Sequence, residues 1–109
     1  MPAPWIQFLD ELKDEAGTLA KEELKDLLLK SLTDSNEFLK KQAVKVERYL
    51  NQLAAGEITK EQFEGYMKDI ESLTRMQALK LTVEAKARAQ RLADGIQNLI
   101  LDKMLKLLP

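Results

Sequence analysis

Apolar residues recur at steps of three and four along nearly the whole chain, which is the spacing that places side chains on one face of an α-helix. In the first half this stripe comprises Trp5, Leu9, Leu12, Ala16, Ala20, Leu24, Leu28, Leu32, Leu39, Ala43, Val46 and Leu50, with Ser35 in phase. In the second half it comprises Phe63, Met67, Ile70, Ala78, Leu81, Ala85, Ala89, Leu92, Ile96, Ile100 and Leu107, with Thr74 in phase. Four glycines and three prolines are too few for the turns of a β-rich fold. The sequence therefore predicts an all-α protein with a single helical domain over residues 1–109.

The strongest stop signal lies between the two stripes, at residues 55–59. Gly56 suits the left-handed conformation that ends a helix. Thr59 is the expected N-cap of the next helix, with Gln62 as its capping-box partner. Ile58 and Phe63 flank this cap with the spacing of a hydrophobic staple. The chain is therefore expected to end one helix and begin another here.

Two segments of similar length around one turn predict a long antiparallel helical hairpin. The segments run from about 4 to 55 and from about 60 to 108, and each would be about 75 Å long if continuous. Apolar steps of four, three and four average about 3.67 residues per turn, which favours near-straight or slightly right-handed winding. Thr33-Asp34-Ser35-Asn36 is a run of poor helix formers, and Asp34 with Glu37 fits a capping box. A three-helix variant broken near 33–36 therefore stays open.

A two-helix hairpin would leave many apolar residues uncovered. Those off the stripe include Ile6, Phe8, Leu19, Leu27, Phe38, Tyr49, Leu53, Tyr66, Leu73, Leu79, Leu99, Leu101 and Leu105. Exposed on a monomer, they would form a larger patch than such proteins usually carry. We therefore expect a homo-oligomer, a dimer or tetramer, associating into a coiled coil or helical bundle. The candidate interaction face comprises Trp5, Phe8, Tyr66, Leu99, Leu101, Leu105 and Leu108.

The C-terminal segment 96–108 is apolar over an unusually wide face and is edged by Lys103 and Lys106. Such a segment can lie on a membrane surface or dock in the groove of a partner. It can also pack against Trp5 and its neighbours at the open end of the hairpin. We favour this second interpretation, because the N-terminal apolar residues need a partner too.

The residue inventory argues against catalysis. The chain contains no cysteine and no histidine, which removes thiol nucleophiles together with the commonest general base and metal ligand. The acid pairs Glu11/Glu15 and Glu22/Asp26 lie mostly off the apolar stripe, as expected of a solvated helix face. No nucleophile motif, phosphate-binding loop or metal-ligand spacing occurs. We therefore expect no enzyme, with no catalytic, cofactor-binding or metal-binding residues.

The sequence also argues against nucleic-acid binding and against a membrane span. The basic stretch from Arg75 to Arg91 lacks interleaved aromatic residues, and the net charge of the chain is −1. The longest apolar runs, at 27–29 and 99–101, are far too short to cross a bilayer. No basic region precedes an apolar one as in a signal peptide, so we expect a cytoplasmic protein.

One short stretch resembles a known family. Residues 53–63, LAAGEITKEQF, contain a G-x-I-T-x-x-x-F turn similar to that of the short bacterial oligomerisation modules of the SHOCT type. The resemblance covers about a tenth of the chain, and the flanking helical segments are longer than those of that family. It implies a helix-turn-helix at this point, and we infer no function from it.

These observations together predict a non-catalytic structural or interaction protein, a self-assembling helical rod or scaffold. The alternative is a protein that binds a membrane surface or a partner helix through its apolar C-terminal face, 96–108.

Overall fold

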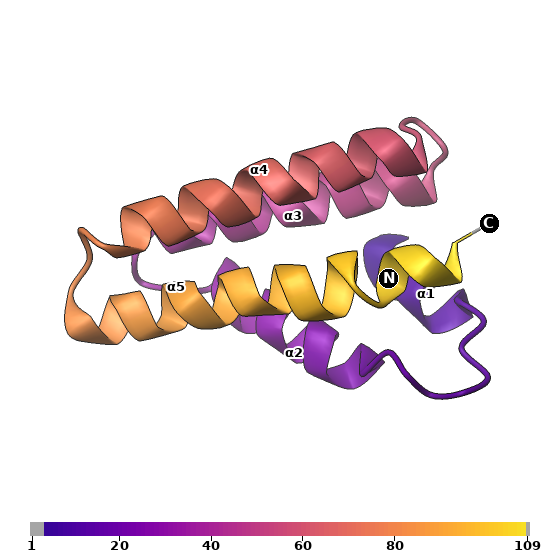
Figure 1. The fold of residues 1–109 in the computed structure, drawn as a ribbon, viewed down its shortest axis with the longest axis horizontal. Helices are drawn as coiled ribbons and strands as arrows, with labels where there is room; N and C mark the ends of the chain where they lie inside the picture. The colour runs from indigo at the N-terminus through magenta and orange to yellow at the C-terminus, as the bar shows by residue number, and fades with distance from the viewer. Residues whose placement is uncertain (1–3, 109) are drawn as a thin grey trace.

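The computed structural model describes residues 4–108, and in this range the chain is all-helical and contains no strand. The α-helices are α1 (Pro4–Glu11), α2 (Lys21–Leu32), α3 (Glu37–Ala54), α4 (Lys60–Ala78) and α5 (Val83–Gly95). A π-helical segment (Ile96–Leu101) and a 3₁₀ turn (Met104–Leu107) follow α5. In Figure 1, α3 and α4 lie side by side above α5 and α2, and α1 lies toward the right-hand end.

The α3–α4 pair is held together by two facing apolar stripes. Asn36 begins α3, because its side-chain oxygen accepts a hydrogen bond from the backbone N–H of Leu39 at 3.1 Å. The buried apolar residues are Leu39, Ala43, Val46 and Leu50 on α3, and Phe63, Met67, Ile70 and Ala78 on α4. Burying one large apolar side chain of this kind contributes about 1.5–3 kcal/mol. The apolar stripe of each helix is thus buried against helices of the same chain.

The two uninterrupted helices predicted for about 4–55 and about 60–108 are not present. The first segment breaks at residues 12–20 and 33–36, and the second breaks at 79–82. The molecule measures 39 × 27 × 24 Å. It is therefore not the rod of about 75 Å that two continuous helices would form. The open alternative of a break near 33–36 is present, together with two breaks that the apolar pattern did not reveal.

Short polar side chains cause the break at 33–36. The carboxylate of Asp34 accepts a hydrogen bond from the backbone N–H of Asn36 at 2.8 Å. The hydroxyl of Thr33 donates to the backbone carbonyl of Lys30 at 3.1 Å. These side chains take up backbone groups that a continuing helix would pair internally, so the helix ends and a new one begins.

The break at 79–82 reverses the chain between α4 and α5. Thr82 caps α5, because its hydroxyl oxygen accepts a hydrogen bond from the backbone N–H of Ala85 at 3.3 Å. The N–H groups of Lys80 and Leu81 bond back to the last turn of α4. This reversal lets α5 pack along α4 and bury Ala85, Ala89 and Leu92.

The break at 12–20 is organised by Asp14. Its carboxylate accepts hydrogen bonds from the backbone N–H groups of Thr18 and Leu19 at 3.0 and 2.8 Å, and from the Thr18 hydroxyl at 3.1 Å. Gly17 has a left-handed backbone with φ of +64°. The sequence pattern placed residues 12–20 inside the continuous helical segment from about 4 to 55, and that prediction is wrong because Asp14 ties the backbone into a turn.

The N-terminal helix packs on α3 rather than on the end of a rod. Trp5 is fully buried, and its indole N–H donates to a carboxylate oxygen of Glu47 at 3.1 Å. The backbone N–H of Trp5 donates to the side-chain oxygen of Asn51 at 3.0 Å. The polar atoms of this large residue are therefore paired, as a buried tryptophan requires.

The C-terminal residues enter the same core through a local widening of the helix. Leu92, Ile96, Ile100 and Met104 are all buried, at a constant spacing of four residues. An α-helix has about 3.6 residues per turn, so residues spaced by four advance by slightly more than one full turn at each step. In a regular α-helix the later side chains of this series would therefore point progressively away from the core. The π-helical segment, whose wider turn includes the bond from the N–H of Asp102 to the carbonyl of Gln97 at 2.9 Å, keeps them in line.

Candidate functional site

The predicted turn residues shape the connection between α3 and α4. Gly56 has φ of +74°, which a residue with a Cβ adopts only with strain. The hydroxyl oxygen of Thr59 accepts from the N–H of Gln62 at 3.1 Å, and the Gln62 side chain accepts from the N–H of Thr59 at 2.9 Å. Ile58 is half-buried and Phe63 is fully buried. These five residues therefore have a clear structural use and expose no reactive group.

The predicted interaction face does not come together as one exposed surface. Trp5, Leu99 and Leu105 are buried in the core of the same chain. The other members, Phe8, Tyr66, Leu101 and Leu108, are half-buried. The breaks fold the chain back on itself, so most of the apolar residues that a straight hairpin would expose are buried or half-buried within the same chain, with Leu79 as an exception.

The same folding accounts for the apolar C-terminal face, 96–108. Ile96, Leu99, Ile100, Met104 and Leu105 are buried in the cluster that contains Trp5. Their side chains pack inward, so they do not offer a free surface to a membrane or a partner helix.

A different apolar surface is exposed where α4 meets α5. Met76, Leu79 and Val83 are 62%, 73% and 82% exposed, and we call residues 76–83 the α4–α5 corner. The other large apolar residues that are well exposed among those described are Leu29 at 48% and Val44 at 38%. Sequence reasoning missed the corner because it treated residues 76–83 as the inside of a continuous helix. Thr82 caps α5 in the structure, but a lone threonine does not by itself mark a helix start in the sequence.

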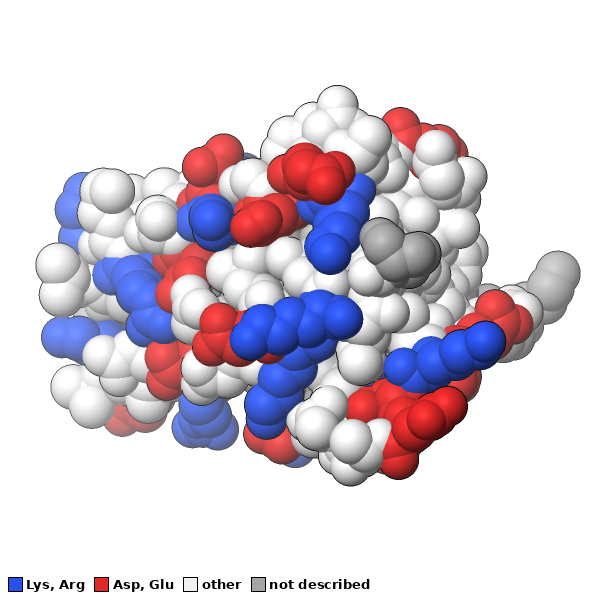
Figure 2. All heavy atoms as spheres, turned by 45° about the vertical axis from the view of Figure 1, so that its right-hand side comes forward, with Lys and Arg blue, Asp and Glu red and all other residues white. Residues whose placement is uncertain are grey.

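The charges are distributed unevenly along the long axis of the molecule. Residues 33–44 and 76–88, at the left-hand end of Figure 1, carry five basic and three acidic side chains: Lys40, Lys41, Lys80, Lys86, Arg88, Asp34, Glu37 and Glu84. Residues 4–20 and 55–61, at the right-hand end, carry two basic and six acidic ones: Lys13, Lys60, Asp10, Glu11, Asp14, Glu15, Glu57 and Glu61. Between the ends both signs are interspersed, as the face drawn in Figure 2 shows. The end with the α4–α5 corner is thus net positive and the opposite end net negative.

A groove of about 450 Å³ lies between α2 and the end of α5, and we call it the α2–α5 groove. The apolar residues that line it are Leu27, Gly95 and Leu99. Charged residues line it from both sides: Glu23, Asp26 and Lys30 on α2, and Arg91, Asp94 and Lys103 on and after α5. Asp26 pairs with Lys30 and Asp94 pairs with Arg75, each at 3.0 Å. Glu23 and Arg91 form no ion pair with the other described residues.

Gly95 lets α2 approach α5 at the bottom of this groove. A Cβ at position 95 would overlap the Cδ2 atom of Leu27 and would lie 3.6 Å from its Cγ. By contrast, a Cβ at Gly65, in the middle of α4, would meet no atom within 4 Å. An alanine at position 95 would therefore have to displace the Leu27 side chain, whereas one at position 65 would displace nothing.

A bidentate ion pair between Asp34 and Arg88 lines a smaller hollow that adjoins the α2–α5 groove and shares Leu27, Lys30 and Arg91 with it. The Arg88 guanidinium donates to both carboxylate oxygens of Asp34, at 2.8 and 3.2 Å, and so ties α5 to the α2–α3 connection. The Asp34 side chain is only 8% exposed. Burial by itself would raise the pKa of Asp34, but the hydrogen bonds from Arg88 and from the Asn36 N–H outweigh it and leave that pKa lowered. The charged form of Asp34 is therefore the form that stabilises the fold.

Arg75 ties α4 to α5 beside the groove. Its guanidinium contacts Glu71 at 2.8 Å and Asp94 at 3.0 Å. Hydrogen bonding to Glu71, and then to Asp94, raises the pKa of Arg75, against the opposing effect of burial. The bases that suggested a nucleic-acid surface are thus partly engaged with acids of the same chain.

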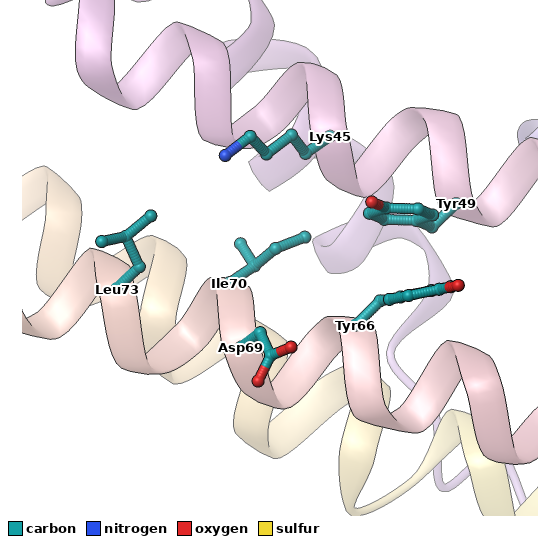
Figure 3. A pocket seen from close by; sticks show the side chains of 6 residues that line it. All are labelled: Lys45, Tyr49, Tyr66, Asp69, Ile70 and Leu73. Carbon is teal, nitrogen blue, oxygen red and sulfur yellow. The ribbon is translucent and has the colours of Figure 1, made fainter.

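A smaller hollow lies on the outer side of the α3–α4 pair. Figure 3 shows Lys45 and Tyr49 on α3 opposite Tyr66, Asp69, Ile70 and Leu73 on α4. The rings of Tyr49 and Tyr66 are stacked, with centroids 4.3 Å apart. The hollow has a volume of about 150 Å³, which is below the range of about 300–1,000 Å³ that is usual for ligand pockets. The tyrosine stack is therefore best understood as part of the contact between the helices.

The described residues offer little chemistry beyond these surfaces. Among residues 4–108, no group of three or more acidic side chains is placed to hold a metal ion. The described helices include none with the length and hydropathy needed to cross a membrane. Gln42 is buried, and its side-chain oxygen has no hydrogen-bond donor among the described residues. The α4–α5 corner and the α2–α5 groove therefore remain as the candidate functional surfaces.

Comparison with known proteins returned no matching family model, no matching curated protein and no matching solved structure. The likeness of residues 53–63 to the SHOCT-type turn therefore rests on those residues alone.

Proposed function

We propose that the chain is a non-catalytic interaction protein that assembles with a second copy of itself through the α2–α5 groove. The assembling unit is the folded bundle, 39 Å in its longest dimension, rather than an extended rod. The single observation that carries the proposal is the groove itself, in which an apolar floor lies between two charged sides.

Charge supports a second copy as the occupant. Glu23 lies on the α2 side of the groove and Arg91 on the α5 side, and neither forms an ion pair with the other described residues. In a dimer with two-fold symmetry the same surface is used twice, so a residue i that contacts j of the partner is matched by j contacting i. In such a dimer Glu23 of each copy would face Arg91 of the other copy. The charges of the groove are therefore complementary to those of a second, identical groove.

The lining fits a protein better than a small molecule. Small-molecule sites are lined mainly by apolar and aromatic side chains with a few polar groups. The α2–α5 groove has six charged side chains and no aromatic one. Charged sides around a narrow apolar floor match the polar rim and apolar centre of a protein interface.

Sedimentation velocity over a wide range of protein concentration tests the proposal. The parent chain should show a dimer at micromolar concentration. Glu23→Arg and Arg91→Glu should each weaken it about tenfold or more, because like charges then face each other twice. An equimolar mixture of the two variants should recover a heterodimer, since each supplies the charge that the other lacks.

The matched control is Glu57→Arg, an equal charge reversal at an exposed position in the turn between α3 and α4. It should leave the dimer unchanged. A parent chain that stays monomeric throughout, or a Glu57→Arg effect as large as that of Glu23→Arg, would refute the groove as the dimer contact.

A further inference from the structure

We propose that the α4–α5 corner docks on an anionic lipid surface, with Leu79 and Val83 entering the interface and neighbouring lysines meeting the headgroups. This surface is separate from the α2–α5 groove and the inference does not depend on self-association. It also differs from the C-terminal segment, whose apolar residues pack into the core.

The apolar side chains of the corner are largely exposed to solvent. Leu79 and Val83 are 73% and 82% exposed, and Met76 in the preceding helical turn is 62% exposed. All three lie within eight consecutive residues, at one end of the molecule (Figure 1). Large apolar side chains gathered at one site on a surface mark a site of interaction with a protein or a membrane.

The charge around the corner selects an anionic partner. Lys80 is exposed within the corner itself, and Lys40, Lys41 and Lys86 lie in the neighbouring turns at the same end. The acids at this end are Asp34, Glu37 and Glu84. Asp34 is already paired with Arg88, which leaves the four lysines against two glutamates. Lysines next to an exposed apolar surface are attracted to the negative potential of an anionic leaflet.

The residue types favour lipid over protein as this partner. The residues that dominate the binding energy of protein interfaces are enriched in tryptophan, tyrosine and arginine rather than in leucine and valine. The corner combines exposed apolar side chains with Lys80, has three more lysines in the neighbouring turns, and contains no aromatic residue. Three side chains also make too small a patch for a stable protein interface, which buries about 800 Å² on each partner. At a lipid interface, by contrast, the apolar area of a few inserted side chains is supplemented by the attraction of neighbouring lysines to anionic headgroups.

Co-sedimentation with vesicles tests the proposal directly. The intact chain should partition onto vesicles of phosphatidylcholine with phosphatidylserine at least about tenfold more strongly than onto phosphatidylcholine alone. Added salt should weaken the binding, because it screens the lysines from the headgroups. Equal partition onto both vesicles, or none onto either, would overturn the proposal.

Matched variants locate the contact. Val83→Asp should reduce partition about tenfold or more, and an acid in the first turn of α5 is compatible with the helix dipole, so the fold is preserved. Leu29→Asp makes the same kind of change at an exposed position on α2 and should alter partition less than about twofold. Equal losses in the two variants would mean that the corner is not the docking surface.

The emission of an introduced tryptophan reports contact with the membrane directly, without a variant that weakens binding. Tryptophan emission of Leu79→Trp should shift to the blue when anionic vesicles are added, because the indole enters an apolar environment. Emission of Leu29→Trp should not shift, and Trp5 contributes the same buried background to both. A shift in Leu29→Trp without one in Leu79→Trp would place the membrane contact on α2 and overturn the proposal.

Discussion

Gly65 and Gly95 both lie in helices, yet the same substitution should change stability in opposite directions at the two positions. Gly65→Ala places a methyl group where no atom lies within 4 Å. Replacing a glycine inside a helix by alanine then stabilises the fold by about 0.5–1 kcal/mol, because the unfolded chain loses conformational freedom. Gly65→Ala is therefore the reference for what alanine contributes without a packing change.

Gly95→Ala gains the same helix term but must displace Leu27. The new methyl group would overlap the Cδ2 atom of that side chain. Forcing extra atoms into a packed contact costs about 1–3 kcal/mol. Leu27 is half-buried and can yield partly into the α2–α5 groove, so we expect the lower half of that range. With a cost of about 1–2 kcal/mol for the displacement and a gain of about 0.5–1 kcal/mol from the helix term, the net effect is a destabilisation centred on about 0.75 kcal/mol, and Gly95→Ala should lie about 1–2 kcal/mol below Gly65→Ala.

Urea unfolding followed by far-UV circular dichroism measures this difference, at a fixed protein concentration below that at which the chain associates. The midpoint should move in opposite directions in the two variants with an unchanged m-value. Combining Gly95→Ala with Leu27→Ala should remove the penalty, because the displaced side chain is then absent, and a double-mutant cycle should give a clear coupling free energy. If Gly95→Ala is as stabilising as Gly65→Ala, the close approach of α2 to α5 is refuted.

Two further predictions concern single polar side chains. Gln42→Met should raise the free energy of unfolding by about 1 kcal/mol, because it replaces a buried oxygen without a donor by an apolar group of similar length; a lower urea midpoint would mean that the amide is paired. The lowered pKa of Asp34 means that the unfolded state binds a proton more readily, so its stabilising effect should be lost as the pH falls below the ordinary value of 3.8. Asp34→Asn should flatten the acid limb of stability against pH, and an unchanged limb would show that Arg88 does not hold the carboxylate.

The sequence predicted the helical class and the turn at Gly56 to Gln62 because both depend on local rules. The helical class follows from apolar residues at helical spacing, which form one buried face whichever element covers it. The turn follows from a capping box, whose hydrogen bonds join residues only three apart. The same stripes did not reveal where the chain reverses. A stripe records which side of a helix is buried and says nothing about whether the next helix continues or turns back.

The missed breaks depend on hydrogen bonds of single side chains. Asp14 accepts three such bonds in the connection before α2. Thr82 supplies the single cap that begins α5. One aspartate or threonine is compatible with many helical sequences, so neither residue alone distinguishes a cap from a tolerated polar residue. The exposed α4–α5 corner could not be predicted for the same reason, because its exposure follows from the reversal at Thr82.

The π-helical segment makes the C-terminal end of the core depend on the width of one helical turn. A π-helical turn holds one residue more than the corresponding α-helical turn. If the six residues of this segment closed into a regular α-helix, everything that follows would rotate by about 100° around the axis. Met104 and Leu105, which are now buried, would then leave the core and expose the space beside Trp5. Deleting one residue between 96 and 101 would by contrast allow a regular α-helix with the same residues facing inward, so the wide turn lets the extra residue be accommodated while the two ends of the chain still meet.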